Sequence, residues 1–156
     1  MLGRFQEFGS RFPNEPLFDL AHHYRSTSHL ENADYAAYME EVSLRLKPGG
    51  IIIDDGFRES YTREERIECL VDLQAKLGPD YRIEVISNKR GPKSILIQRA
   101  IPNGEQKIFF GGSEKSRLLL GGCYCTPIAE YNATWPARVV RNEVIGKLKK
   151  LFIDST

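Results

Sequence analysis

Two pairs of titratable residues stand at places in this sequence where chemistry can be carried out. The first pair, His22 and His23, ends an apolar segment that begins at Leu17. An imidazole titrates near neutral pH, so either histidine can serve as general base for a hydroxyl acceptor. The alternative is a histidine pair at a strand end, hydrogen-bonded to backbone or water, and the sequence leaves both interpretations open.

The second pair, Asp54 and Asp55, follows the β-branched run Ile51–Ile53. Carboxylate oxygens are the ligands that Mg²⁺ prefers, which makes the pair a candidate metal site. Adjacent side chains on a strand, however, point to opposite sides, and Asp55-Gly56 is a common turn sequence. The turn is therefore the favoured interpretation, with Mg²⁺ ligation by Asp54 and Asp55 as the alternative.

The other polar motifs are weaker. His29 adds a third histidine to the same window, but the spacing matches no standard zinc pattern. Cys123 and Cys125 lack the second pair that a zinc site needs, and three cysteines in all favour a reducing compartment. Gly-Gly-Ser-Glu-Lys-Ser at 111–116 lacks the order of a phosphate loop and predicts a hairpin loop instead.

The bulk properties of the chain exclude some classes of function. Its 156 residues suffice for one domain with a real core, and a net charge of +1 gives no global attraction to nucleic acid or membrane. No apolar run approaches the ~20 residues that span a bilayer, and the first residues lack the apolar stretch of a signal peptide. We therefore expect a cytoplasmic protein with no membrane partner.

Hydrophobic periodicity predicts the order strand, helix, strand, helix, strand, strand. The strands are expected at 17–22, 51–53, 81–87 and 94–98, and the helices at 34–46 and from a Thr62–Glu65 capping box to Gly78. Pro48-Gly49-Gly50 is expected to end the first helix. Alternating β and α elements indicate a parallel sheet, and the closing pair of strands indicates an antiparallel edge.

Residues 101–156 differ in character from residues 1–100. Apolar runs at 107–110 and 117–120 predict a hairpin, and a basic amphipathic helix is expected from about Pro136. Its apolar stripe consists of Val140, Val144, Leu148 and Leu151. We expect this extension to pack on the same domain, with docking of the basic face on RNA or acidic lipid as the alternative.

The segment Leu44–Gly56 also carries a family resemblance. A Leu-Lys-Pro-Gly-Gly turn before an Ile strand resembles the second half of class I S-adenosylmethionine-dependent methyltransferases. The order of elements over 17–99 is similar to the way that domain ends, from its fourth to its seventh strand. The resemblance implies an α/β fold with a partial Rossmann-like sheet over residues 1–100.

The resemblance also implies roles for particular residues. Asp19 and His22 lie where that family contacts S-adenosylmethionine and often the methyl acceptor, and His22 and His23 become candidate bases. Glu7 matches the acidic residue that contacts adenine, and Asp54 and Asp55 match the metal-ligating aspartates of some O-methyltransferases. The glycine-rich cofactor loop of the family has no counterpart in the sequence.

Two functions are compatible with a sequence that resembles the second half of this family and lacks its glycine-rich cofactor loop. The first is a truncated or split methyltransferase acting on an oxygen or nitrogen acceptor. The second is a non-catalytic binding or assembly module with a methyltransferase-like half-fold. In either case the strand Ile51–Ile53 is expected to expose an edge, which the segment after residue 100, a second copy or a partner chain covers.

Overall fold

The computed structural model describes residues 7–59, 63–103, 106–108, 117–118, 123–132, 147–148 and 150–151. The first half contains α1 (Phe8–Arg11), β1 (Phe18–His23), η2 (Ser26–His29), α2 (Asn32–Leu44), β2 (Leu46–Asp54) and η3 (Asp55–Glu59). The second half contains α3 (Arg63–Leu77), β3 (Tyr81–Asn88), β4 (Gly91–Arg99), β5 (Ile101–Asn103), β6 (Gln106–Ile108), β7 (Arg117–Leu118) and β8 (Tyr124–Pro127). The predicted order of strands and helices up to residue 99 is confirmed.

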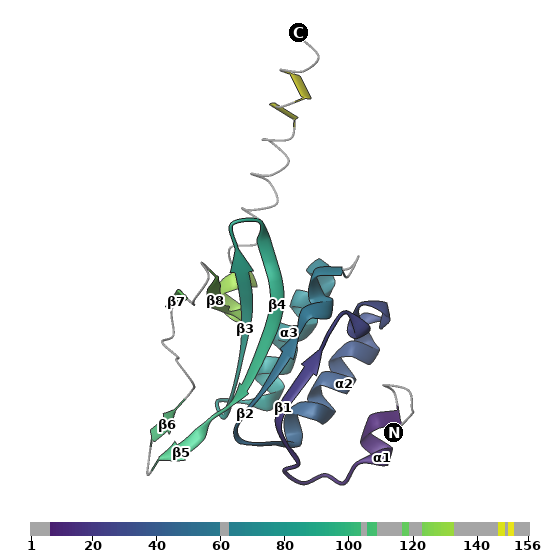
Figure 1. The fold of residues 1–156 in the computed structure, drawn as a ribbon, viewed down its shortest axis with the longest axis vertical. Helices are drawn as coiled ribbons and strands as arrows, with labels where there is room; N and C mark the ends of the chain where they lie inside the picture. The colour runs from purple at the N-terminus through teal and green to yellow at the C-terminus, as the bar shows by residue number, and fades with distance from the viewer. Residues whose placement is uncertain are drawn as a thin grey trace.

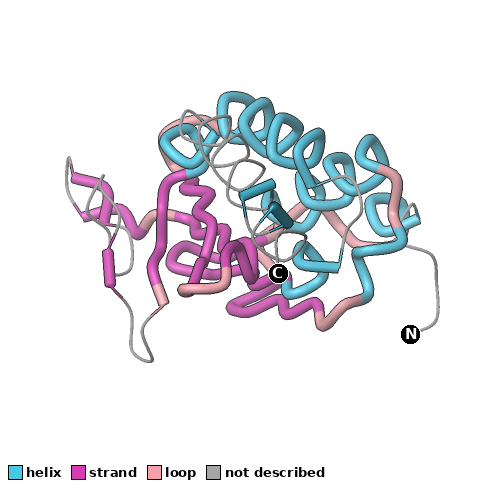
Figure 2. Tube along the Cα trace, turned by 90° about the horizontal axis from the view of Figure 1, so that it is seen from above, coloured by secondary structure: helices cyan, strands magenta, loops and turns pink. Residues whose placement is uncertain are grey.

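The main sheet has six strands in the order β1-β2-β4-β3-β8-β7 (Figure 1). β1 and β2 are parallel, whereas β4 runs antiparallel to both of its neighbours, β2 and β3. Helices α2 and α3 lie together on one face of the sheet (Figure 2). The α/β class and the antiparallel β3–β4 pair are as predicted, but the pair does not form the edge, because β4 lies inside the sheet.

The prediction that Ile51–Ile53 would expose an open edge is wrong. β2 is flanked by β1 on one side and by β4 on the other, so its backbone groups have partners along both edges. Ile52 is fully buried, and Ile51 and Ile53 are partly buried. Among the described residues, β1 and β7 are the strands at the two edges of the sheet.

Pro48-Gly49-Gly50 does not end a helix as predicted. Helix α2 ends earlier, at Leu44, and the three residues lie within β2. Phe18 pairs with Leu46 and Leu20 with Ile51, so residues 47–50 bulge out opposite a single residue of β1. The bulge needs its glycines, because Gly49 has a φ of +81° and a Cβ on Gly50 would lie 2.8 Å from the carbonyl oxygen of Lys47.

The core lies between the sheet and its two helices. Alternate residues of the central strands point to this side and are buried against apolar residues of α2 and α3. The main contributors are Tyr35, Met39, Val42, Ile52, Ile67, Leu70, Ile83, Val85, Ile95 and Ile97. Each fully buried side chain of this size stabilises the fold by roughly 1.5–3 kcal/mol, which makes this layer the main source of stability.

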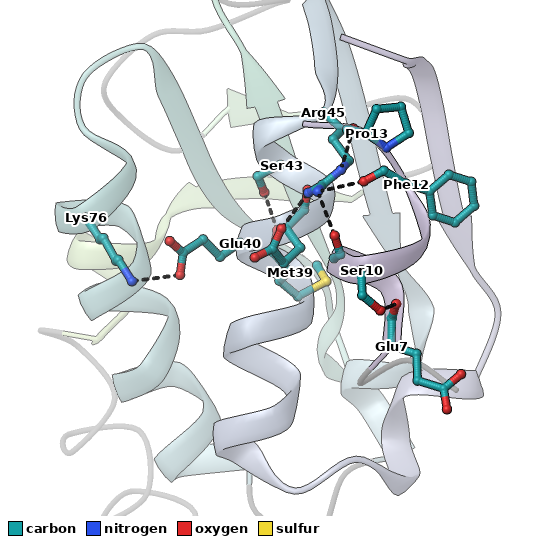
Figure 3. A network of polar contacts seen from close by, with 11 residues as sticks. Glu7, Ser10, Phe12, Pro13, Met39, Glu40, Ser43, Arg45 and Lys76 are labelled. Carbon is teal, nitrogen blue, oxygen red and sulfur yellow. Dashed lines mark hydrogen bonds and ion pairs between the residues drawn. The ribbon is translucent and has the colours of Figure 1, made fainter. Parts of the chain in front are cut away.

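A buried arginine fixes the N-terminal segment to the end of α2 (Figure 3). The Arg45 guanidinium donates to the carbonyl oxygens of Pro13 at 2.9 Å and Phe12 at 3.1 Å, and to the Glu41 carboxylate at 2.5 Å. It is 2% exposed, so its donors are satisfied almost entirely within the protein. This cluster lies at the amino ends of β1 and β2.

Among the described residues beyond residue 100, β6 pairs with β5, and β7 pairs with β8. The predicted hairpin between 107–110 and 117–120 falls largely on residues outside the described ranges and stays a prediction. Residues 109–116 lie outside the described residues. Most of the predicted terminal helix does too, although residues 147–148 and 150–151 are helical, with Leu148 and Leu151 exposed. No helix in the described ranges is long and apolar enough to cross a membrane.

Candidate functional site

The sheet separates the two aspartates that the sequence pairs. Asp54 is the last residue of β2 and pairs with His23 of β1 and Ile95 of β4. Because side chains alternate, Asp54 points with Ile52 and Ile95 toward the helices. His22 and Ile53 point to the opposite face, and the chain leaves β2 with Asp55 on that same side. The site therefore has one carboxylate on each side of the sheet.

Asp55 joins three neighbouring strands at the carboxyl edge of the parallel pair. His22, at the end of β1, places Nε2 at 2.7 Å from Asp55 Oδ2. The Ser94 hydroxyl, on β4, donates to Asp55 Oδ1 at 2.5 Å. The side chains of His22 and Asp55 are 49% and 30% exposed, so the cluster is open to a ligand. Parallel strands in α/β sheets bind ligands at this edge.

The charge of Asp55 is held in place by its neighbours. Burial alone would raise the pKa of this carboxyl, but hydrogen bonds from His22 and Ser94 and the positive charge of Lys93 outweigh it and lower the pKa. An ionised carboxylate only accepts hydrogen bonds, so the Nε2 atom of His22 must carry a proton and donate it. In a neutral ring the lone pair is then on Nδ1, which is the atom able to take up a proton.

Asp54 has a different role, as the centre of a buried network. Its carboxylate accepts hydrogen bonds from the Thr27 hydroxyl at 2.6 Å, from the Tyr35 hydroxyl at 2.7 Å and from the Gly56 backbone at 2.9 Å. Asp54 is fully buried. With three donors around its two oxygens, this carboxylate links β2 to η2 and α2 and is closed to solvent.

Arg66 of α3 completes that network. Its guanidinium lies 4.1 Å from the centre of the Tyr35 ring and donates to the carbonyl oxygens of Thr27 at 3.1 Å and Leu30 at 2.5 Å. Burial raises the pKa of Tyr35 well above its ordinary value, with Asp54 adding to the effect, so the phenol keeps the proton it donates. The network holds in place the segment that follows β1.

His23 faces the helices and is 8% exposed, unlike its neighbour His22. Its Nε2 atom lies 2.6 Å from the Tyr38 hydroxyl. Burial lowers the pKa of His23, although the charge of Asp54 opposes the effect, and burial raises the pKa of Tyr38 to about 12. His23 is thus a neutral core histidine, and of the two predicted bases only His22 lies at the accessible edge.

The residues assigned to cofactor contacts do not converge. Glu7 pairs with Arg11 at 2.8 Å beside α1, which lies at the amino end of the sheet. Asp19 lies in the first half of β1, is 83% exposed and pairs with Lys47 at 3.3 Å. His22 lies at the other end of the same strand. The three residues therefore do not form one pocket.

The carboxylates offered for Mg²⁺ are both occupied by protein donors. Asp54 and Asp55 point to opposite faces, and no group of three or more histidine, cysteine, aspartate or glutamate side chains suited to a metal occurs among the described residues. A magnesium site at Asp54 and Asp55 stays a prediction. The Asp55-Gly56 sequence starts η3, in agreement with the turn interpretation.

Ser94 is the member of the cluster that sequence reasoning missed. Its position 39 residues beyond Asp55 gives no local signal, since only the register of β4 against β2 brings the two together. Thr27 and Tyr35 were missed for the same reason. A register that pairs Asp54 with Ile95 would have indicated that the next residues outward, Asp55 and Ser94, meet.

Comparison of the chain with protein-family models, with curated proteins and with solved structures found no match.

Proposed function

We propose that this chain is half of a methyltransferase-like α/β domain and that His22, held by Asp55, is its general base. The observation that carries the proposal is the His22–Asp55 pair at the carboxyl edge of β1 and β2, where α/β sheets bind ligands. The acceptor is an oxygen or nitrogen nucleophile with a proton to lose.

The order of elements supports this assignment. Two parallel strands joined by a helix lead through a second helix to an antiparallel pair of strands, as the resemblance to class I methyltransferases implies. A fold can host many activities, so this order supports the domain type and the site supports the chemistry.

The chemistry assigned to this chain is a proton transfer. The acceptor O–H or N–H gives its proton to Nδ1 of His22, and the resulting imidazolium is stabilised by the Asp55 carboxylate on Nε2. Ser94 holds the other carboxylate oxygen, which fixes the orientation of the pair. General bases typically accelerate a reaction by about 10²–10⁴-fold, and we expect His22 to contribute a rate enhancement in that range.

The described residues do not by themselves fit S-adenosylmethionine. Glu7 and Asp19 are tied in ion pairs away from His22, and neither faces the His22–Asp55 edge. Within this proposal the groups that hold the cofactor belong to a partner chain or to the other half of the domain. The role of His22 does not depend on how that half is supplied.

A methyl-transfer assay on the native assembly tests the proposal. The tagged chain is isolated with its bound proteins from cells of the organism that encodes it and is given S-adenosylmethionine with a tritiated methyl group. Wild-type assemblies should transfer label to protein, nucleic acid or a small molecule. His22→Ala and Asp55→Asn should lower the rate about 10²-fold or more, as expected for loss of a general base.

His29→Ala is the matched control, because His29 is an exposed histidine in η2 outside the cluster. It should transfer label at the wild-type rate. Absence of any transfer by the wild-type assembly would reject the methyltransferase assignment. Full activity of a folded His22→Ala assembly would reject the base while leaving the domain assignment in place.

A second candidate function is a non-catalytic assembly module. β1 is one of the two edge strands of the main sheet as described, and Leu20 on it is 57% exposed. Such an edge suits pairing with a second copy of the chain or with another protein. Sedimentation of the pure chain over a range of concentrations should then show a dimer that Leu20→Lys dissociates and Leu44→Lys, a change on α2, does not. A monomer at every concentration excludes the homodimer.

A further inference from the structure

Basic side chains that form no ion pair with a described carboxylate gather around the carboxyl edge of the sheet. The four residues are Arg25, Lys89, Arg90 and Lys93, and all are exposed. Arg25 follows β1, Lys89 and Arg90 form the turn between β3 and β4, and Lys93 precedes Ser94 on β4. In Figure 1 the β3–β4 turn rises past the ends of β1 and β2. We call these four residues the basic rim.

The basic rim differs from other basic positions on the surface. Lys47 pairs with Asp19 at 3.3 Å and Lys76 with Glu40 at 2.8 Å. None of the four rim cations makes an ion pair with a carboxylate in the part of the chain that the structure describes. Since the whole chain carries a net charge of only +1, the rim is a local excess of positive charge.

The rim cations are close enough to act together. β1 and β4 are separated only by β2, so the ends of β1 and β4 are about 10 Å apart at a strand spacing of about 4.8 Å. That separation is comparable to the screening length of about 8–10 Å at physiological salt. The positive potentials of Arg25 and Lys93 therefore overlap above His22 and Asp55, and the hairpin turn extends the same field outward.

An exposed aromatic ring lies in the same place. Tyr24 is 67% exposed, and the Arg25 guanidinium lies 5.2 Å from the centre of its ring. Arg25 has a φ of +61°, a left-handed conformation that is unusual for a residue with a side chain. The chain thus presents an aromatic face with a cation beside it at the end of β1, next to His22.

We propose that the basic rim and Tyr24 bind single-stranded nucleic acid. Proteins that bind single strands combine a basic track for the phosphates with aromatic side chains on which unpaired bases stack. Here Tyr24 supplies the stacking face, and the rim cations supply the track. A lipid surface suits the edge less well, because Tyr24 and Tyr124, which pairs with Ser87 beside the β3–β4 turn, are the large exposed apolar side chains that the described residues offer there, and two rings do not make a broad apolar face.

The proposal goes beyond methyl transfer and does not depend on it. Binding requires the rim and Tyr24 only, whereas the proposed base is His22. A nucleic-acid strand lying along the rim would pass the His22 side chain, which is 49% exposed, so the two proposals are compatible. They fail separately, because binding to nucleic acid is measured without cofactor or turnover.

Fluorescence anisotropy with a labelled oligouridylate of about 12 nucleotides tests the proposal on the full chain. Four phosphate contacts predict a slope near −3 for log affinity against log salt, since each contact in a single strand contributes about 0.7. Lys89→Ala/Arg90→Ala should reduce that slope by about half. Tyr24→Ala should weaken binding about tenfold, whereas Tyr24→Phe, which keeps the ring, should bind like wild type.

The matched control is Lys47→Ala/Lys76→Ala, which removes the same charge from lysines outside the rim. It should bind the oligonucleotide like wild type, and circular dichroism should show every variant folded. The proposal is overturned by the absence of saturable binding at low salt, or by equal weakening in the control. It is also overturned if Tyr24→Ala binds like wild type, or if the chain binds phosphatidylserine vesicles and not the oligonucleotide.

Discussion

Asp54 and Asp55 are adjacent in the chain and lie in two contrasting regions of the molecule. On the helix side, Asp54 is fully buried and accepts hydrogen bonds from Thr27, Tyr35 and Gly56. On the other side, Asp55 is 30% exposed and shares its oxygens between His22 and Ser94. The plane of the sheet at the end of β2 forms the boundary between the two regions.

The difference shows how one sheet edge can separate a buried, structural carboxylate from one that a ligand can reach. A buried carboxylate with all its donors in place is fixed and closed to solvent. A carboxylate whose partners are an exposed imidazole and a hydroxyl remains reachable by a ligand. His23 and His22 repeat the contrast one strand away, with His23 against Tyr38 in the core and His22 at the surface.

The largest expected effect is the loss of stability when the buried network around Asp54 is disrupted. Asp54→Ala should lower the free energy of unfolding by about 3–5 kcal/mol, because it leaves the hydroxyls of Thr27 and Tyr35 buried without their acceptor. Asp55→Ala should cost about 1–2 kcal/mol, because only the Ser94 hydroxyl is left buried without its acceptor, while His22 is 49% exposed and can bond to water. Urea denaturation of the two variants measures both. Equal losses would contradict the contrast between the two carboxylates.

A smaller loss is expected at Gly56, where the chain passes between the two regions. A Cβ at this position would lie 2.2 Å from the Thr27 hydroxyl oxygen and 3.1 Å from Asp54 Oδ1. Gly56→Ala should therefore destabilise the protein by about 1–3 kcal/mol through overpacking. In a Thr27→Ala background the same change should cost less, since the clashing oxygen is gone. A cycle of denaturation measurements in which the two changes add without coupling would exclude the clash.

The pH dependence of stability should distinguish His23 from the exposed histidines. Because burial lowers the folded pKa of His23 below 6.5, the unfolded chain binds a proton that the folded chain does not. This contribution is complete above pH 6.5 and is lost as pH falls through the folded pKa. The urea midpoint should fall between about pH 7.5 and pH 5, and His23→Gln should reduce that fall. His29→Gln, at an exposed position, should leave it unchanged.

The smallest expected effect concerns the exposed carboxylate, Asp55, and its hydrogen bond from Ser94. Ser94→Ala should cost about 1 kcal/mol, the net scale of one hydrogen bond, because the Asp55 carboxylate that loses its donor is 30% exposed and is reached by water. Because the Ser94 hydroxyl helps to lower the folded pKa of Asp55, its removal should raise that pKa toward 3.8. The stability that Asp55 contributes above pH 3.8 and loses as pH falls should shrink accordingly. A carboxyl carbon NMR titration of Asp55 that matches wild type would contradict this role of Ser94.

The regular elements up to residue 99 could be predicted because their patterns are local. Tyr35, Met39 and Val42 are spaced for one helix face, and all three are buried on α2. Gly78, with a φ of +79°, follows α3 as expected for a glycine C-cap. Pro48-Gly49-Gly50 was misassigned because the same residues suit a helix stop and a bulge. The pairing of Leu46 with Phe18 decides between them, and it is a long-range contact.

The candidate site could be predicted only in part. The positions of His22 and Asp55 at one sheet edge follow from strand ends, which the sequence marks with a change from apolar to polar residues. Which aspartate enters the interior depends on Tyr35 and Thr27, and which one reaches a hydroxyl depends on Ser94. These partners lie 19, 27 and 39 residues away, so local patterns carry no information about them.

The bulge at residues 47–50 has a consequence for how this sequence can vary in evolution. After the bulge, the residues of β2 pair in register with β1, and this register fixes which side of the sheet each side chain faces. Ile52 and Asp54 must therefore stay on the helix side and Asp55 on the other. The bulge takes up the residues between the end of α2 and that fixed ladder. Insertions or deletions at its exposed residues, Lys47 and Pro48, leave the phase of the strand intact. The same change placed between Ile51 and Asp55 would exchange the buried carboxylate for the exposed one.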